Sequence, residues 1–188
     1  FKKQRDAVGL SLYSDKVEFH SESKTTNKHH IALQNELLNV VNISSEFKNT
    51  ASVESIHQIA SKLHKRSLVL FFTDMLEGVE DLSKIFSALH HLKFNKHEVI
   101  LFHLSENKTE FELDFKNSPY KFIDIETKEE IKLNPSELKD EYKKRSDLFL
   151  KELKIRCLQH KIDLVEIDVN RGVEQILISY LLKRQKMF

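Results

Sequence analysis

The stretch Ser67-Leu-Val-Leu-Phe-Phe-Thr-Asp74 decides the fold, because an almost wholly apolar run ends abruptly in polar residues. A short run of this kind, between a helical pattern and a turn, is typical of a strand buried on both faces of a parallel sheet. We therefore predict that residues 67–72 form a central strand. Open α/β sheets bind their ligands at the carboxyl ends of their strands, so Asp74 is the first candidate for a functional site.

Strand and helix patterns alternate on both sides of this run. The other expected strands are residues 7–13, 16–20, 98–104 and 162–169. Apolar residues at spacings of three and four predict helices over 31–42, 51–65, about 78–93, about 134–159, and a last segment with Val173, Ile176, Leu177, Tyr180 and Leu181. Helices between buried strands predict a three-layer, Rossmann-like α/β fold with a doubly wound, mostly parallel sheet. Residues 7–20 would be its antiparallel edge hairpin.

Residues 105–160 interrupt this alternation. The sequence pattern of residues 120–133 predicts a second hairpin, which turns near Thr127-Lys128. Asn134-Pro135-Ser136-Glu137 then begins a helix, with Asn as the cap, Pro at the first helical position and Glu reaching back to the cap. A length of 188 residues suits one domain with a full core. We therefore predict a single domain, 1–188, with a hairpin-plus-helix insertion at 105–160.

Composition argues against several functional classes. With 30 basic and 29 acidic residues, the formal charge of +1 gives no general attraction to nucleic acid. The three glycines (Gly9, Gly78 and Gly172) allow none of the usual phosphate-binding loops. No apolar run approaches the ~20 residues of a membrane span. One cysteine, Cys157, and the lack of a recognisable signal segment predict a reducing, cytoplasmic location.

Familiar catalytic patterns are also missing. The 10 histidines show no zinc-binding spacing, and we expect them to be solvated or satisfied within the fold. No Gly-x-Ser-x-Gly nucleophile motif is present. Cys157 lies on an apolar helical stripe and is expected to be a core residue. Acidic pairs such as Glu129-Glu130 stay open as general acid/base groups, although nothing in their spacing supports that role.

Asp74 and Thr50 are the candidates for a cation site. A carboxylate at position 74 can hold a hard cation such as Mg²⁺, directly or through water. Alternatively, Thr73 or Asp74 can cap the helix that follows. Thr50 closes a polar loop and opens the helix over 51–65, so its hydroxyl can either ligate a metal or cap that helix.

Segments spread over nearly the whole chain resemble a known pattern. Residues 6–14, 49–56 and 67–74, in this order, are similar to the von Willebrand factor type A pattern. The segment from Tyr120 to Pro135, with the long helix after it, resembles the bacterial family called domain of unknown function fifty-eight. The resemblance implies a von Willebrand factor A-like fold with a metal ion-dependent adhesion site at the carboxyl edge of its sheet.

The resemblance matches that metal site only in part. Thr50 and Asp74 correspond to its threonine and aspartate, but the Asp-x-Ser-x-Ser motif of the first strand is absent. That motif would belong upstream of Phe1, so we expect an N-terminally truncated domain that binds Mg²⁺ only in the full-length protein. The sheet would then lack its central first strand, and its open edges could pair with each other or with another chain by self-association.

The resemblance also implies a function. Members of the family look like interaction proteins that act with MoxR-type AAA+ ATPases in the assembly or maturation of other proteins. We therefore expect a protein-binding module, not an enzyme, that binds at the carboxyl edge of the sheet. The alternative is a metal-dependent hydrolase of the phosphatase or nuclease type that uses Asp74 and Asp168, because both residues lie near carboxyl ends of predicted strands.

Overall fold

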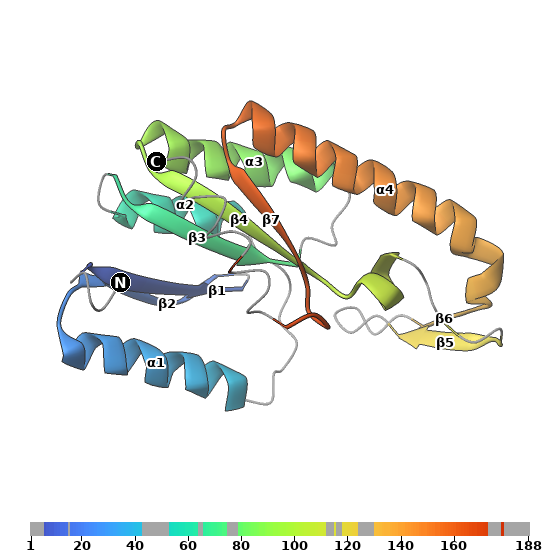
Figure 1. Ribbon diagram of the computed structural model, residues 1–188, viewed down its shortest axis with the longest axis horizontal. Coiled ribbons are helices and arrows are strands. Elements are labelled where there is room, and N and C mark those ends of the chain that lie inside the picture. Colours follow the sequence, from blue (N-terminus) through green and yellow to red (C-terminus); the bar gives the residue numbers. More distant parts are fainter. Residues whose placement is uncertain are drawn as a thin grey trace. The chain divides into compact units, whose positions relative to one another are not determined.

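The computed structural model describes residues 6–14, 16–42, 53–63, 66–74, 79–111, 115, 118–123, 130–172 and 178 (Figure 1). The chain divides into two compact units. The hairpin unit comprises Phe1–Lys65 with Ile125–Lys128, and the sheet unit comprises Arg66–Asp124 with Glu129–Phe188. Thr50, the turn near Thr127 and the last predicted helix fall outside the described residues. Among the described helices, none is long and apolar enough to span a bilayer.

The hairpin unit contains the predicted antiparallel pair, β1 (Val8–Tyr13) and β2 (Val17–Lys24). The second strand is longer than the alternating pattern of 16–20 suggested, because the polar residues up to Lys24 still pair with β1. A close approach of the two strands requires Gly9, since a Cβ there would lie 2.7 Å from the carbonyl oxygen of Ser21. Two helices follow, α1 (Asn27–Asn42) and α2 (Val53–Lys62).

Three parallel strands form the sheet of the sheet unit, in the order β3 (Leu68–Thr73), β4 (Glu98–Ser105) and β7 (Asp163–Asp168). Our prediction of a parallel sheet is thus confirmed for these strands, whereas the predicted central position of residues 67–72 is not. In this sheet β3 takes an edge, where Phe72 is 51% exposed, and β4 takes the middle. The predicted burial of this strand on both faces is also wrong for the described residues, since Phe71 is buried on one face while Leu70 and Phe72 on the other are exposed. An apolar run does not give the order of the strands.

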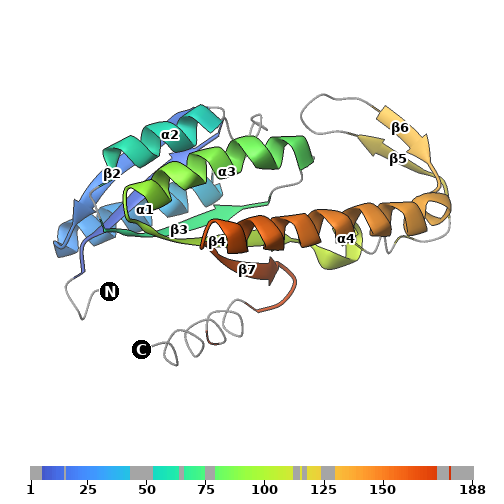
Figure 2. The same ribbon diagram turned by 90° about the horizontal axis from the view of Figure 1, so that it is seen from above.

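One face of this sheet is covered by α3 (Val79–Phe94) and α4 (Pro135–Gln159), which run side by side along it (Figure 2). The buried helix residues are Leu82, Ile85, Phe86, Leu89 and Leu92 of α3 with Leu153 and Cys157 of α4. On the other face, Ile100, Phe102 and Ile167 form an apolar cluster, and the ring of Phe102 stacks on that of Phe72. The sequence predicts cover on both faces of the sheet, and cover of this second face stays a prediction.

The segment between β4 and β7 contains the predicted second hairpin, β5 (Tyr120–Ile123) paired antiparallel with β6 (Glu130–Leu133). It leads directly into α4, whose first helical residue is Pro135, as predicted. Asn134 occupies the cap position, but its side chain accepts a hydrogen bond from the hydroxyl of Ser136 (2.9 Å) and does not cap the backbone. The carboxyl half of α4 packs on the sheet and returns the chain to β7.

Helices α3 and α4 end in the same backbone motif before β4 and β7. Lys96 and Lys161 have positive φ angles of 64° and 55°. The amide of the next residue bonds five residues back, from His97 to Leu92 (3.2 Å) and from Ile162 to Cys157 (2.8 Å). These are Schellman motifs, which satisfy the last helical carbonyls and reverse the chain. They fix where β4 and β7 begin.

Candidate functional site

The carboxyl ends of β3, β4 and β7 meet at one edge of the parallel sheet, as the sequence predicts for a ligand-binding edge. Asp74 follows the last residue of β3 and is exposed. Ser105 ends β4 and pairs in register with Asp168, the last residue of β7. Thr50 lies outside the described residues, so its predicted approach to Asp74 stays a prediction.

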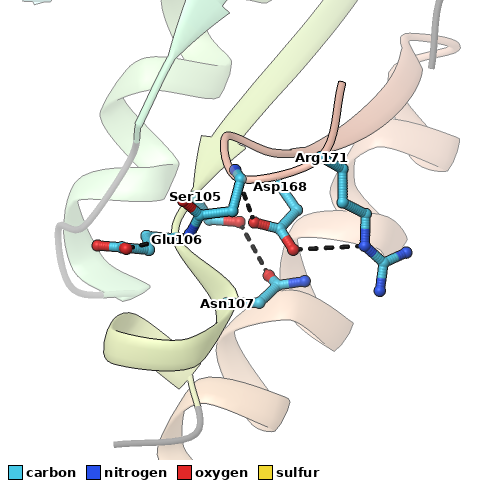
Figure 3. Close-up of polar contacts among 6 residues, drawn as sticks. Ser105, Glu106, Asn107, Asp168 and Arg171 are labelled. Atoms are coloured by element: carbon cyan, nitrogen blue, oxygen red, sulfur yellow. Dashed lines mark hydrogen bonds and ion pairs between the residues drawn. The ribbon is translucent and has the colours of Figure 1, made fainter. Parts of the chain in front are cut away.

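A turn of π-helix, Asn107–Phe111, follows β4 and supplies polar residues that the sequence did not suggest. The backbone amide of Glu110 donates to the carbonyl of Glu106 (2.9 Å), and the amide of Glu106 donates to Oε2 of Glu110 (3.1 Å). Ser105 donates through its hydroxyl to Oδ1 of Asn107 (3.2 Å; Figure 3). The turn therefore holds the side chain of Glu110 against the backbone of Glu106.

Glu106 is held by hydrogen bonds to both carboxylate oxygens. Asn170 donates through Nδ2 to Oε1 (3.0 Å), and Thr109 donates through its hydroxyl to Oε2 (2.7 Å). These two donors, Asn170 first and Thr109 second, lower the pKa of Glu106 below its ordinary value, because they stabilise the charged form. Glu106 is therefore a carboxylate with a fixed orientation, which ties the turn after β4 to the turn after β7.

Glu110 has the opposite electrostatic environment. Partial burial raises its pKa, because leaving water disfavours the charged form. The amide of Glu106 opposes that shift, while the negative charges of Asp74 and Glu106 add to it. Asp74, from the end of β3, thus adds to the negative charge around Glu110, in the turn after β4. The edge therefore concentrates negative charge.

Asp168 is engaged in local structure. Its Oδ1 accepts a hydrogen bond from the amide of Asn170 (3.2 Å), which is the geometry of an Asx turn. Its Oδ2 lies 3.4 Å from Nε of Arg171, and the carboxylate side chain is only 13% exposed (Figure 3). The turn is closed further by the amide of Arg171, which donates to the carbonyl of Asp168 (2.9 Å). Asp168 thus stabilises the loop that carries Asn170 and Arg171.

Asp74 and Asp168, the two carboxylates of the alternative hydrolase site, come from strands that are not neighbours in the sheet. Strand β4 separates β3 from β7, so the backbones of Asp74, just after β3, and Asp168, the last residue of β7, are about 10 Å apart at ~4.8 Å per strand spacing. Among the residues that the structure describes, no three His, Cys, Asp or Glu side chains are grouped to hold a metal. The Mg²⁺ site predicted from Thr50 and Asp74 stays a prediction, because Thr50 lies outside the described residues.

Sequence reasoning pointed to the carboxyl edge of the sheet through Asp74 and Asp168, but it did not single out Glu106, Thr109 and Asn170, which make polar contacts there. Their signal was weak, because each is a common polar residue in a loop. The usable clue was position, since Ser105-Glu106-Asn107 directly follows a buried strand. Cys157 is buried in α4, as predicted, and burial raises its pKa to about 12. The expectation that the histidines are solvated or satisfied is wrong for His97, which is buried with Nε2 making no hydrogen bond.

Comparisons with known proteins assign the chain to no family. No family model matches the chain, and no curated protein and no solved structure matches it. The fold and the edge define a mixed α/β protein with a parallel sheet and polar residues gathered at the carboxyl ends of its strands. The resemblance to the von Willebrand factor type A pattern remains a prediction from the sequence.

Proposed function

We propose that the chain is a protein-interaction module that binds its partner at the carboxyl edge of the β3–β4–β7 sheet. The main support is the ordered polar rim formed by the two turns that follow β4 and β7. Glu106 and Asp168 are held by specific hydrogen bonds and by Arg171, so the rim would lose little side-chain freedom when it binds. Pre-organised polar groups of this kind favour specific recognition.

The charge of the rim suggests the chemistry of the partner. The carboxylates at the edge belong to Asp74, Glu106, Glu110 and Asp168, and its cations are Arg171, paired to Asp168, and Lys108, close to Glu106. The chain as a whole is almost neutral, so this excess of negative charge is local. A local excess of one sign of charge steers a complementary partner and suppresses others. A partner with Lys and Arg at its interface therefore fits best, and a MoxR-type AAA+ ATPase is the candidate that the family resemblance suggests.

The alternative of a metal-dependent hydrolase has less support. Its two proposed carboxylates come from strands that are not neighbours, and Asp168 is already occupied by Asn170 and Arg171. A hydrolase of this type needs carboxylates that converge on one ion or one water. Loss of phosphatase or nuclease turnover in an Asp74→Ala variant would restore this alternative.

The direct test measures binding of a purified MoxR-type ATPase to the full chain by calorimetry, with Mg²⁺ and with a chelator. Asp74→Arg should weaken binding about tenfold or more, because it reverses an exposed charge on the rim. Glu98→Arg is the matched control, since Glu98 begins β4 at the opposite edge, roughly 23 Å away along the strand. Absence of binding in both conditions would refute this partner, and equal effects of the two variants would refute the proposed edge.

A further inference from the structure

Two histidines are in contact at the amino end of the sheet, where helices α3 and α4 finish. The ring of His90, near the end of α3, packs edge to face against the ring of His160, the C-terminal cap of α4. Their centroids are 5.5 Å apart and their planes meet at 72°. Both helices belong to the sheet unit and pack against each other. The two histidines are far apart in the sequence, so no spacing along the chain could predict this pair.

The separation of the two rings is close to that of two imidazoles bound to one metal ion. Histidine nitrogens bind Zn²⁺ at ~2.0–2.1 Å, and the ion prefers a tetrahedral arrangement of its ligands. Each ring centroid then lies about 3.2 Å from the ion, which places the two centroids about 5.2 Å apart. His90 is exposed, so its ring can turn a nitrogen toward His160 without disturbing the core. The pair therefore needs little movement to bind one ion.

His160 is held in a state that suits a metal ligand. Burial lowers its pKa, and the positive charges of His90 and Arg156 lower it further, so the ring is neutral at neutral pH. Only the neutral imidazole has a lone pair to give to a metal. The ring is also kept in place, because it stacks on the buried Phe86 with centroids 5.4 Å apart. A neutral ligand with a fixed position loses little freedom when it binds an ion.

The charges around the pair are compatible with a bound cation. Arg156 is the nearby positive charge, but its Nε lies 2.7 Å from Oε1 of Glu152, and this ion pair offsets it. Both helices end beside the pair, and the negative end of a helix dipole favours a cation near the last turn. Electrostatics therefore does not oppose an ion between the two rings.

A second histidine contact, at the start of α1, is less suitable for a metal. The ring centroids of His29 and His30 are 6.5 Å apart, and adjacent residues of a helix point to different sides. In addition, Nε2 of His29 lies 2.9 Å from the carbonyl oxygen of Val8 and is thus engaged within the hairpin unit. Closeness of two histidines alone does not make a site, and only the contact between α3 and α4 has the required separation.

We propose that His90 and His160 bind one Zn²⁺ ion, which joins the ends of α3 and α4. Among the described residues no third His, Cys, Asp or Glu completes the set, so water fills the other positions of the ion. With half the protein ligands of a structural zinc site, the Kd should be on the order of 10–100 µM. The ion stabilises the two helices that cover one face of the sheet. This site does not depend on the function proposed for the carboxyl edge.

Isothermal titration calorimetry of the full chain with ZnCl₂ tests the proposal. The wild-type chain should bind about one ion per chain. His90→Ala should weaken binding about tenfold or more, because it removes one of the two protein ligands and, as an exposed helix residue, leaves the core intact. His91→Ala is the matched control, since His91 is the next residue of the same helix and points to a different side, and this variant should bind as the wild type does.

Thermal unfolding provides a second readout, because an ion that binds only the folded chain raises its midpoint. Zn²⁺ at about 1 mM should raise the midpoint of the wild type and of His91→Ala by about 3–10 °C and leave that of His90→Ala nearly unchanged. Mg²⁺ at the same concentration is the control ion, since it prefers oxygen ligands and should have no such effect. The proposal is overturned if the wild type shows no binding up to 1 mM Zn²⁺, or if His90→Ala binds as tightly as His91→Ala.

Discussion

The amino and carboxyl ends of the β3–β4–β7 sheet use polar side chains in different ways. At the amino end, His97 is almost fully buried, and its Nδ1 accepts a hydrogen bond from the backbone amide of Ser67 (3.2 Å). The amide of Glu98 donates in turn to the carbonyl of Ser67 (3.0 Å), so β3 and β4 are tied together where they begin. At the carboxyl end, the bond from Asn170 to Glu106 is exposed to water and joins two loops, and the largely buried carboxylate of Asp168 pairs with the exposed Arg171.

The two ends of the sheet therefore suggest different roles, the amino end in stability and the carboxyl end in recognition of a partner. A buried hydrogen bond is costly to break, because the group left behind has no water to replace its partner. A contact near the surface can exchange with water at little cost, and its groups remain available to a ligand. The amino end should therefore carry much of the stability of the sheet unit, whereas the carboxyl end is free to carry a function. The following predictions test this division.

The largest effect is expected for His97→Ala. This change removes a buried ring and leaves the amide of Ser67 without its acceptor, so it should lower the free energy of unfolding by about 2–4 kcal/mol. Urea denaturation measures the loss. His97→Asn is the control, because its side-chain oxygen can still accept the bond from Ser67. A loss below about 1 kcal/mol for His97→Ala would show that the amino end is not the stabilising end.

A pH dependence with a definite sign follows from the same residue. Burial lowers the pKa of His97 below its ordinary value of 6.5, and the bond from Ser67 requires an unprotonated Nδ1. Below pH 6.5 the unfolded chain therefore binds a proton that the folded chain does not, so stability falls as the pH falls through this window and is complete above it. Urea midpoints between pH 8 and 5 should show this fall.

Two other histidines also make stability fall as the pH falls, so the contribution of His97 has to be separated with a variant that lacks it. Burial also lowers the pKa of His20 and His160, the latter further reduced by His90 and Arg156. His97→Asn should consequently flatten the pH dependence without abolishing it. An unchanged slope in that variant would mean that His97 does not couple folding to protonation.

Sequence alone predicted more of the fold than of the site, for physical reasons. The apolar periodicity of residues 98–104 and 78–93 identified β4 and α3, since burial dictates those side chains directly. The order of the strands depends on pairing between distant segments, which no local pattern records. The polar contacts at the carboxyl end could not be predicted either, because the bond between Asn170 and Glu106 joins residues far apart in the sequence.

A stabilising effect of intermediate size is expected at the end of α4, where the chain turns into the amino end of β7. Lys161 adopts a φ of 55°, a conformation that costs residues other than glycine about 1 kcal/mol or more. Lys161→Gly should therefore raise the free energy of unfolding by about 0.5–1 kcal/mol, after the greater freedom of glycine in the unfolded chain is counted. Thermal unfolding is a suitable measurement, with the exposed neighbour Gln159→Gly as a control that should destabilise the last turn of α4. A neutral Lys161→Gly would indicate that this helix end is not strained.

The smallest effect on stability is expected for Glu106→Gln at the carboxyl end. Hydrogen bonds from Asn170 and Thr109 lower the pKa of Glu106, so its stabilising contribution is present above its ordinary pKa of 4.5 and is lost as the pH falls through the lowered value. The group is accessible to water, and glutamine keeps one oxygen acceptor, so the urea midpoint at neutral pH should shift less than in the Lys161 variant. Binding of the protein partner should weaken, because the rim loses a fixed negative charge. A variant that unfolds at much lower urea while it keeps its affinity would assign this end to stability instead, and the contrast between the two ends would no longer hold.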